Sequence, residues 1–106
     1  MSFASIRYAM QCNRAARALR KVIPQQFGMS VTDIAVSHVD NHGAHFTAKC
    51  EGTAVEGTLT NRTVVEQSSR GNAVRVLREA SIRPVGVWRG RAHNKESLLK
   101  LIAASA

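Results

Sequence analysis

The stretch VTDIAVSHVDNHGAHFTAKCE, residues 31–51, decides the fold. Its first half is rich in β-branched residues and its second half alternates apolar and polar side chains, and both patterns are typical of β-strands. Between the halves lies Asp40-Asn41-His42-Gly43, and Asp, Asn and Gly tolerate the positive φ angles of tight hairpin turns. The stretch therefore predicts an antiparallel hairpin of strands Val31–Val39 and Ala44–Glu51.

The second strand of this hairpin has one apolar face. Because side chains alternate along a strand, the apolar set of Phe46, Ala48 and Cys50 points one way. The intervening residues are mostly polar, and they are His45, Thr47, Lys49 and Glu51. We therefore expect one face of the hairpin to be buried.

The sequence after Gly52 predicts further strands. Thr53–Thr60 fits a third strand with Val55 and Leu59 inward, and Gly57 weakens that strand or marks a bulge. Asn61-Arg62 predicts a turn into a short fourth strand, Thr63–Gln67.

The last third of the chain contains an ambiguous segment, Ala73–Ala80. Its Arg, Leu, Glu and Ala content favours a helix, although the spacing of Val74 and Val76 also fits a strand. After it, Val85–Trp88 predicts a short strand, and Asn94 is placed to cap a final helix.

The N-terminal third predicts a basic amphipathic helix over Met10–Ile23, with residues 1–9 as a short strand or as the lead-in to the helix. Residues three and four apart share a helix face, so Arg14, Arg17 and Lys21 form one stripe with Arg20 beside it. Pro24 should end the helix, because the residue before a proline is disfavoured in the α conformation. Arg20 and Lys21 would then lie in the last turn, where the helix dipole favours cations.

These elements together predict a single α+β domain spanning residues 1–106. It would be an antiparallel sheet of three to five short strands, packed against the N-terminal basic amphipathic helix and the C-terminal helix. No apolar run approaches the roughly 20 residues that cross a bilayer, so we expect no membrane insertion. Without a secretory signal, Cys12 and Cys50 are expected to be reduced in a cytoplasmic protein.

The net charge of the 106-residue chain is +8, and its distribution is uneven. Residues 1–30 hold five cations and no acid, and residues 70–106 hold eight cations against two acids. Residues 31–69, where the hairpin lies, sum to −3. Such asymmetry predicts an electropositive face and an anionic partner.

Nucleic acid is the partner that this pattern favours. Arg83–Arg91 interleaves arginines with Trp88 and glycines, as sites for single-stranded nucleic acid do. If Ala73–Ala80 is helical, it adds a second basic helix face. This prediction requires that the first helix and the Trp88 loop lie on the same surface. The predicted nucleic-acid-binding residues are Arg14, Arg17, Arg20, Lys21, Arg75, Arg78, Trp88, Arg89 and Arg91.

Three alternatives stay open. The basic face or a sheet edge could instead dock on an acidic protein partner or on a second copy of the chain as a homodimer. The arginines could serve solubility alone, and Trp88 could be a core residue. An enzyme is not expected, because no carboxylate pair, phosphate loop or nucleophile elbow is present.

Metal chemistry is a further alternative. His38, His42 and His45 surround the predicted turn, and Cys50 follows them. Zinc needs three or four converging ligands, and a nuclease built around a hairpin histidine needs a helix directly after the hairpin. Because Cys50 should point to the core and more strand follows the hairpin, we expect turn and surface histidines, with no bound metal or cofactor.

Overall fold

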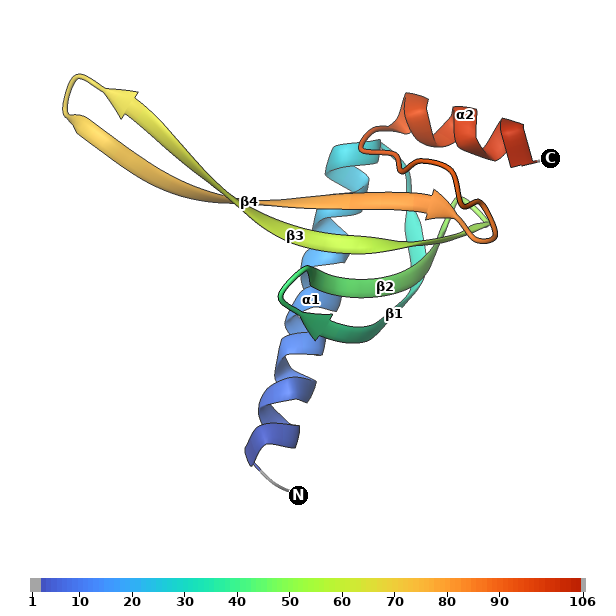
Figure 1. The fold of residues 1–106 in the computed structure, drawn as a ribbon, viewed down its shortest axis with the longest axis horizontal. Coiled ribbons are helices and arrows are strands. Elements are labelled where there is room, and N and C mark those ends of the chain that lie inside the picture. Colours follow the sequence, from blue (N-terminus) through green and yellow to red (C-terminus); the bar gives the residue numbers. More distant parts are fainter. Residues whose placement is uncertain (1–2, 106) are drawn as a thin grey trace.

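The computed structural model describes residues 3–105 (Figure 1). The elements along the chain are α1 (Phe3–Phe27), β1 (Val31–Asp40), β2 (Gly43–Cys50), β3 (Thr53–Ser68), β4 (Gly71–Pro84) and α2 (Lys95–Ser105). The four strands form one antiparallel sheet in the order β1-β2-β3-β4. The predicted α+β class, with a sheet and two flanking helices, is confirmed.

The hairpin predicted from residues 31–51 is confirmed as β1 and β2. Asp40 pairs with Gly43 across the turn, and Phe46, Ala48 and Cys50 are buried. The register advances by two residues on β1 but by one on β2 between the pairs Val36–Phe46 and His38–His45. This bulge adds one residue, Ser37, to β1.

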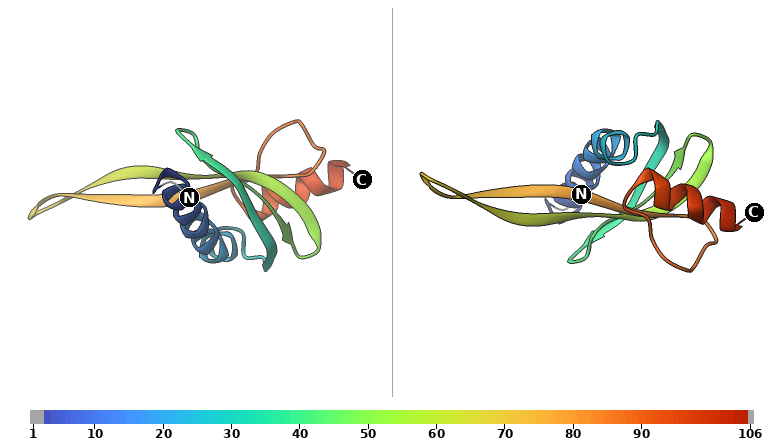
Figure 2. Two further views of the ribbon diagram at one scale, coloured as in Figure 1. Left: turned by 90° about the horizontal axis from the view of Figure 1, so that it is seen from below. Right: turned by 90° about the horizontal axis from the view of Figure 1, so that it is seen from above.

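One face of the sheet carries the core. Leu19, Ile23 and Phe27 of α1 are fully buried with Val55 and Ile82 of the sheet. Leu98 of α2 closes the same core. The other face of the sheet is uncovered by either helix, and we call it the open face (Figure 2).

Helix α1 extends past both predicted ends, so the prediction that Pro24 ends it was wrong. The helix continues through Pro24 to Phe27, and Gly28 terminates it in a left-handed conformation with φ of 62°. An interior proline costs about 3 kcal/mol. Burial of Phe27 offsets this cost, and Arg20 is exposed, so its carbonyl can bond to water.

Because the helix is one turn longer than predicted, Arg20 and Lys21 do not lie at its end. Arg20 and Lys21 now lie one to two turns before the end of α1, and the last turn contains no basic residue. The prediction that these cations stabilise the helix dipole was therefore wrong. Residues 3–9 belong to the helix rather than to a leading strand.

Two predictions in the second half of the chain were wrong for a common reason. Asn61-Arg62 makes no turn, because β3 runs without interruption to Ser68. Ala73–Ala80 is strand and not helix, since it lies within β4. Every residue from Val55 to Ser68 pairs with β4, and this long-range pairing overrides a local helix propensity that is weak by comparison.

The outer halves of β3 and β4, residues 61–78, project from the sheet as a two-stranded ribbon that we call the arm (Figure 1). Ser69 and Arg70 form its tip. Val65, Val74 and Val76 on the arm are 57%, 66% and 62% exposed. Because the arm and the N-terminal half of α1 both extend away from the core, the radius of gyration is 15.5 Å, whereas a compact domain of this length has about 13 Å.

Gly57 marks a close backbone approach rather than a bulge, since the pairing of β3 continues through it on both sides. A Cβ atom on Gly57 would lie 2.1 Å from the carbonyl oxygen of Ser81. The missing side chain therefore lets β3 and β4 approach closely as the sheet curves over the core.

Gln26 ties α1 to the free edge of β4. Its amide nitrogen donates to the carbonyl of Ala80 at 2.7 Å, and its amide oxygen accepts from the N–H of Ala80 at 2.9 Å. The same nitrogen donates to the carbonyl of His93 at 2.8 Å. The side-chain amide of Gln26 thus makes the two hydrogen bonds that a neighbouring strand would make to Ala80, which is fully buried.

The segment after β4 differs from its predicted form in one respect. Val85–Trp88 is not a strand, because Val85 and Gly86 form a turn and the two residues after them have no regular secondary structure. Ala92 then returns to the outer edge of β4 and exchanges both backbone hydrogen bonds with Ile82.

The predicted cap of the final helix is confirmed, because the Asn94 side-chain oxygen accepts from the N–H of Ser97 at 2.8 Å. No helix within residues 3–105 has the length and apolar character needed to cross a membrane.

Replacing Gln26 by Ala should lower the free energy of unfolding by about 2 kcal/mol or more, because each buried polar group left without a partner costs about 1–3 kcal/mol. Urea denaturation would measure the loss. Gln25→Ala is the matched control, since Gln25 is exposed and surface substitutions usually change stability by less than about 0.5 kcal/mol. Equal effects of the two changes would contradict the assigned role of Gln26.

Candidate functional site

A pocket of about 520 Å³ lies where α1, the β1–β2 turn and the base of the arm meet. Arg14 of α1 and Arg78 of β4 line it together with residues of the turn from Val39 to Ala44. Two cations that are 64 positions apart in the sequence are thus brought to one surface. Asp40 is the only acid among the described residues that line this pocket.

A second pocket adjoins the first at Arg78. It lies between the C-terminal half of α1 and the arm, and it is lined by Arg62 and Arg78 on the arm and by Val22 and Gln25 on α1. Lys21 lies seven residues after Arg14 and four before Gln25, so it shares their side of the helix. We call Arg14, Lys21, Arg62 and Arg78 the junction cations.

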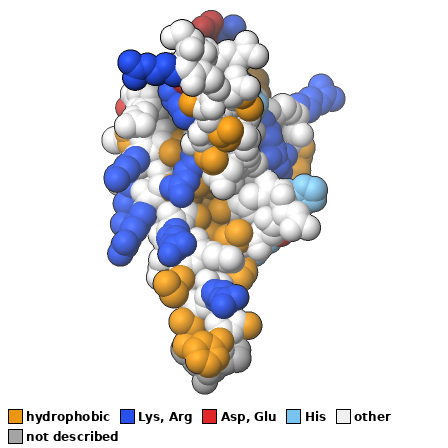
Figure 3. Space-filling view, turned by 90° about the vertical axis from the view of Figure 1, so that its left-hand side faces the viewer, with side chains coloured by type: hydrophobic (Ala, Val, Ile, Leu, Met, Phe, Trp, Pro, Cys, Tyr) orange, Lys and Arg blue, Asp and Glu red, His pale blue; other side chains and the backbone are white. Residues whose placement is uncertain are grey.

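The junction cations carry uncompensated charge. Within residues 3–105, none of them takes part in an ion pair. The acids beside the two pockets have other partners, because Asp40 contacts His38 and His45 and Glu79 contacts His93 at 3.3 Å. Figure 3 shows Lys and Arg side chains gathered on the side from which the arm projects, with apolar side chains between them and little acidic surface.

The remaining predicted cations of α1 lie around this surface. Arg17 neighbours both Arg14 and Lys21 at helical spacing, and it is exposed. Arg20 is also exposed but lies about 100° further round the helix from Lys21. The predicted stripe is therefore present, and Arg20 lies beside it on the helix, as predicted.

Arg75 and Arg78 do not share a helix face, as the prediction required, because both lie on strand β4. Their separation of three residues places them on opposite faces of the ribbon. Arg78 lines the pockets, whereas Arg75 donates to Glu66 at 3.0 Å on the arm. Of the two, only Arg78 joins the cations of α1.

The Trp88 loop and α1 lie on opposite sides of the sheet, so the expectation of a shared surface was wrong (Figure 2). Arg83 projects from β4 onto the open face, where it bonds to Glu56 at 2.9 Å. The Trp88 ring stacks on the Arg83 guanidinium at 5.0 Å. Arg91 donates to the Thr58 hydroxyl at 3.1 Å on the same face. Trp88 is not a core residue either, since it is 77% exposed.

Two cations of the arm were not identified from the sequence as binding residues. Arg62 was assigned to a turn, and it lines the second pocket because β3 continues through it. Arg70 lies at the exposed tip of the arm. The alternation of Val74 and Val76 was the signal for a strand there, and extending it would have placed Arg62 and Arg70 on the same hairpin.

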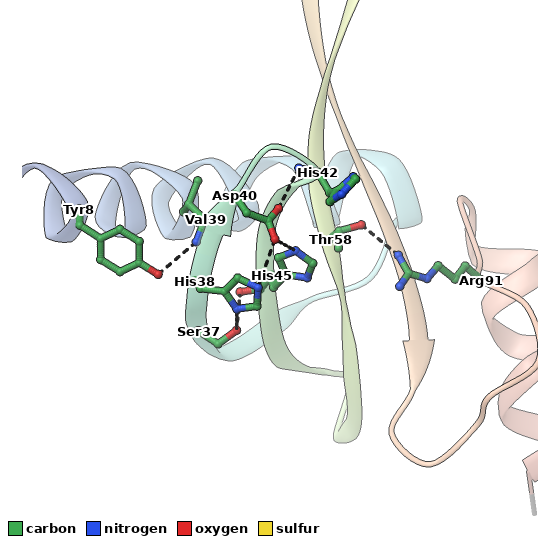
Figure 4. Close-up of polar contacts among 9 residues, drawn as sticks. All are labelled: Tyr8, Ser37, His38, Val39, Asp40, His42, His45, Thr58 and Arg91. Atoms are coloured by element: carbon green, nitrogen blue, oxygen red, sulfur yellow. Dashed lines mark hydrogen bonds and ion pairs between the residues drawn. The ribbon is translucent and has the colours of Figure 1, made fainter.

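The histidines around the β1–β2 turn are only partly brought together. His38 and His45 converge on the carboxylate of Asp40 (Figure 4), whereas the His42 ring lies apart from them. Cys50 is buried on the core face, and burial raises the pKa of its thiol. The metal alternative built on three histidines and Cys50 therefore has the wrong ligand set, since Asp40 takes the place of His42 and Cys50.

Comparison of the chain with protein-family models, with curated protein sequences and with solved structures finds no match. The geometry of the described residues is accordingly the basis for a functional proposal.

The fluorescence of Trp88, the only tryptophan in the chain, should be quenched efficiently by neutral acrylamide in the folded protein. The physical reason is that the indole ring is exposed, although the Arg83 guanidinium lies over one of its faces. The reference is the same protein in denaturant. Quenching that becomes efficient only on unfolding would show that Trp88 is buried.

Proposed function

We propose that this protein binds nucleic acid through the junction cations, as a non-enzymatic accessory or regulatory protein. The observation that supports it is that unpaired cations from α1 and from the arm gather at two adjoining pockets, which share Arg78. Like charges that converge without counter-charges repel one another, and bound phosphates would relieve this repulsion. The contacts would be to the backbone, which position a protein on nucleic acid without selecting a sequence.

The shape of the arm favours a duplex over a single strand. The major groove of B-DNA, about 12 Å wide, admits a two-stranded β-ribbon. The arm is such a ribbon, and it carries four arginines against the single acid Glu66. With the junction cations on the phosphates, the arm is placed to enter or follow a groove. The Trp88 loop, on the far side of the sheet, would take no part, so the proposed site omits Trp88, Arg89 and Arg91.

A protein partner is the second candidate, and the exposed valines of the arm favour it. Val65, Val74 and Val76 form an apolar stripe at a ribbon whose outer edges are unpaired beyond β2. Such edges pair with other strands readily. A second copy of the chain or an acidic protein could dock there. In either case we place the protein in the cytoplasm, where Cys12 and Cys50 would stay reduced.

Binding to duplex DNA of random sequence should weaken steeply with salt. If the four junction cations each neutralise one phosphate, log K against log salt has a slope of about −3.6, from about −0.9 per contact. Arg14→Ala combined with Arg78→Ala should bring the slope to about −1.8. Fluorescence anisotropy of a labelled duplex at several salt concentrations measures both.

Arg89→Ala is the matched control for these substitutions, because it removes one arginine on the Trp88 loop and should leave the slope unchanged. A slope near zero in the native protein would sink the nucleic-acid proposal. If Arg89→Ala instead made the slope less negative by about 0.9, the change expected for one lost phosphate contact, the interface would lie on the open face.

Shortening the arm tests its role separately. Thr63 and Val76 are cross-strand partners, so an Asn-Gly turn in place of residues 64–75 would close the hairpin at that pair. The removed segment contributes nothing to the buried core, and the shortened protein should remain folded. Affinity for the duplex should fall more than affinity for a single strand.

Sedimentation of the native and the arm-shortened proteins tests the second candidate function, binding to a protein partner. A native dimer that becomes a monomer on shortening, with duplex affinity unchanged, would favour the valines as a protein interface and would exclude the arm from nucleic-acid binding.

A further inference from the structure

A cluster of two imidazoles and one carboxylate lies on the open face at the end of the β1–β2 hairpin (Figure 4). The Nε2 atoms of His38 and His45 lie 3.4 Å and 3.0 Å from the same oxygen, Oδ2 of Asp40. The two rings are stacked, with centroids 4.0 Å apart and planes 12° from parallel. The three potential ligand atoms lie within 4.8 Å of one another.

The hairpin register produces this cluster. His38 and His45 are direct cross-strand partners. Asp40 follows His38 by two residues and therefore shares its face of the strand. The bulge at Ser37 sets this pairing, because without the extra residue Ser37 would stand opposite His45. Bulges commonly re-aim side chains in this way.

The carboxylate of Asp40 is held with one oxygen free for the histidines. Its Oδ1 atom accepts from the backbone N–H of His42 at 2.8 Å, and this bond lowers the pKa of the Asp40 carboxyl. Oδ2 faces the two imidazoles. The group is thus presented as a single-oxygen ligand.

The hydrogen bonds of Ser37 leave the contact between His38 and Asp40 without a shared proton whenever the His38 ring is neutral. The Ser37 hydroxyl donates its only hydrogen to the carbonyl of His45 at 3.1 Å. Its 3.3 Å contact with Nδ1 of His38 then requires that His38 donate from Nδ1. A neutral His38 ring consequently presents a lone pair at Nε2, and this lone pair faces the lone pairs of Asp40 Oδ2 at 3.4 Å.

We propose that a divalent transition-metal ion of the zinc class binds here, with His38 Nε2, His45 Nε2 and Asp40 Oδ2 as ligands. A cation accepts the lone pairs of His38 Nε2 and Asp40 Oδ2 and removes the conflict between them. His45 Nε2, which donates to Asp40 Oδ2 at 3.0 Å in the absence of an ion, joins them once its ring carries the proton on Nδ1. Ligands about 2.0–2.1 Å from a tetrahedral ion are separated by about 3.4 Å, close to the 3.0 and 3.4 Å observed here. Two imidazoles and a carboxylate suit Zn²⁺ and its neighbours rather than Mg²⁺ or Ca²⁺.

The surroundings of the cluster also suit a bound ion. His38 is half-exposed, so a fourth position is open to water. Ser37 fixes the tautomer of His38 from behind, as outer hydrogen-bond partners do at metal sites. The bound ion would fasten the tips of β1 and β2 together beside the turn that lines the Arg14 pocket. Because the ligands lie on the open face, metal binding can be tested without nucleic acid.

The test uses tag-free, chelator-treated full-length protein titrated with Zn²⁺ by calorimetry and with Co²⁺ by visible absorption. We expect one ion per chain and Co²⁺ bands typical of four- or five-coordinate sites. His38→Ala and His45→Ala should each weaken binding at least 10-fold. Ser37→Ala should weaken it about 10- to 100-fold, the range for outer hydrogen-bond partners of metal ligands.

His42→Ala and His93→Ala are the controls, since both histidines lie outside the cluster, and both variants should bind as the native protein does. Imidazole nitrogen NMR provides a readout that does not depend on affinity, because Zn²⁺ should shift the Nε2 signals of His38 and His45 only. Absence of saturable binding, or equal losses in the cluster and control variants, would overturn the proposal. Thermal melting confirms that each variant is folded before it is scored.

Discussion

The hydrogen bonds between Gln26 and Ala80 are the constraint on which the rest of the structure depends. They attach the last turn of α1 to the outer edge of β4 at the point where the arm leaves the sheet. On the core side of this point, Ala92 pairs with Ile82 and covers the same edge. On the far side, β3 and β4 continue as a ribbon with no further cover. The position of Gln26 therefore sets both the direction of α1 and the base of the arm.

The sheet to which α1 is attached in this way has two chemically different sides. The junction cations gather where α1 meets the arm, and their charges have no acidic partners among the described residues. The open face carries paired charges instead, such as Arg83 with Glu56, together with the histidine cluster of the hairpin. Uncompensated cations suit a polyanion, whereas two converging imidazoles and a carboxylate suit a metal ion. The two sites meet at Asp40, which lines the Arg14 pocket and also belongs to the histidine cluster, whereas His38 and His45 belong to the cluster alone.

The predictions that succeeded depended on local chemistry. The Asp40–Gly43 turn and the alternation after it define a hairpin within about 20 residues, and the buried set of Phe46, Ala48 and Cys50 follows from the period of a strand. The Asn94 cap is likewise a contact between near neighbours in the sequence. The cationic stripe on α1 follows from helical spacing alone. For the site, this stripe located Arg14 and Lys21 but gave no indication of what faces them.

By itself, the sequence determined the α+β class, the hairpin of residues 31–51 and the charged stripe of the first helix, because each arises from side chains within a few residues of one another. The tertiary structure alone decided that α1 passes through Pro24, since burial of Phe27 and the bonds of Gln26 outweigh a local helix breaker. It also decided that residues 73–80 form a strand, because pairing with β3 supplies hydrogen bonds that a local propensity scale does not contain. The separation of Trp88 from the cations of α1 has the same origin. Which face of a sheet a distant segment reaches depends on the register and twist of the strands between them, and no short-range pattern in the sequence encodes that.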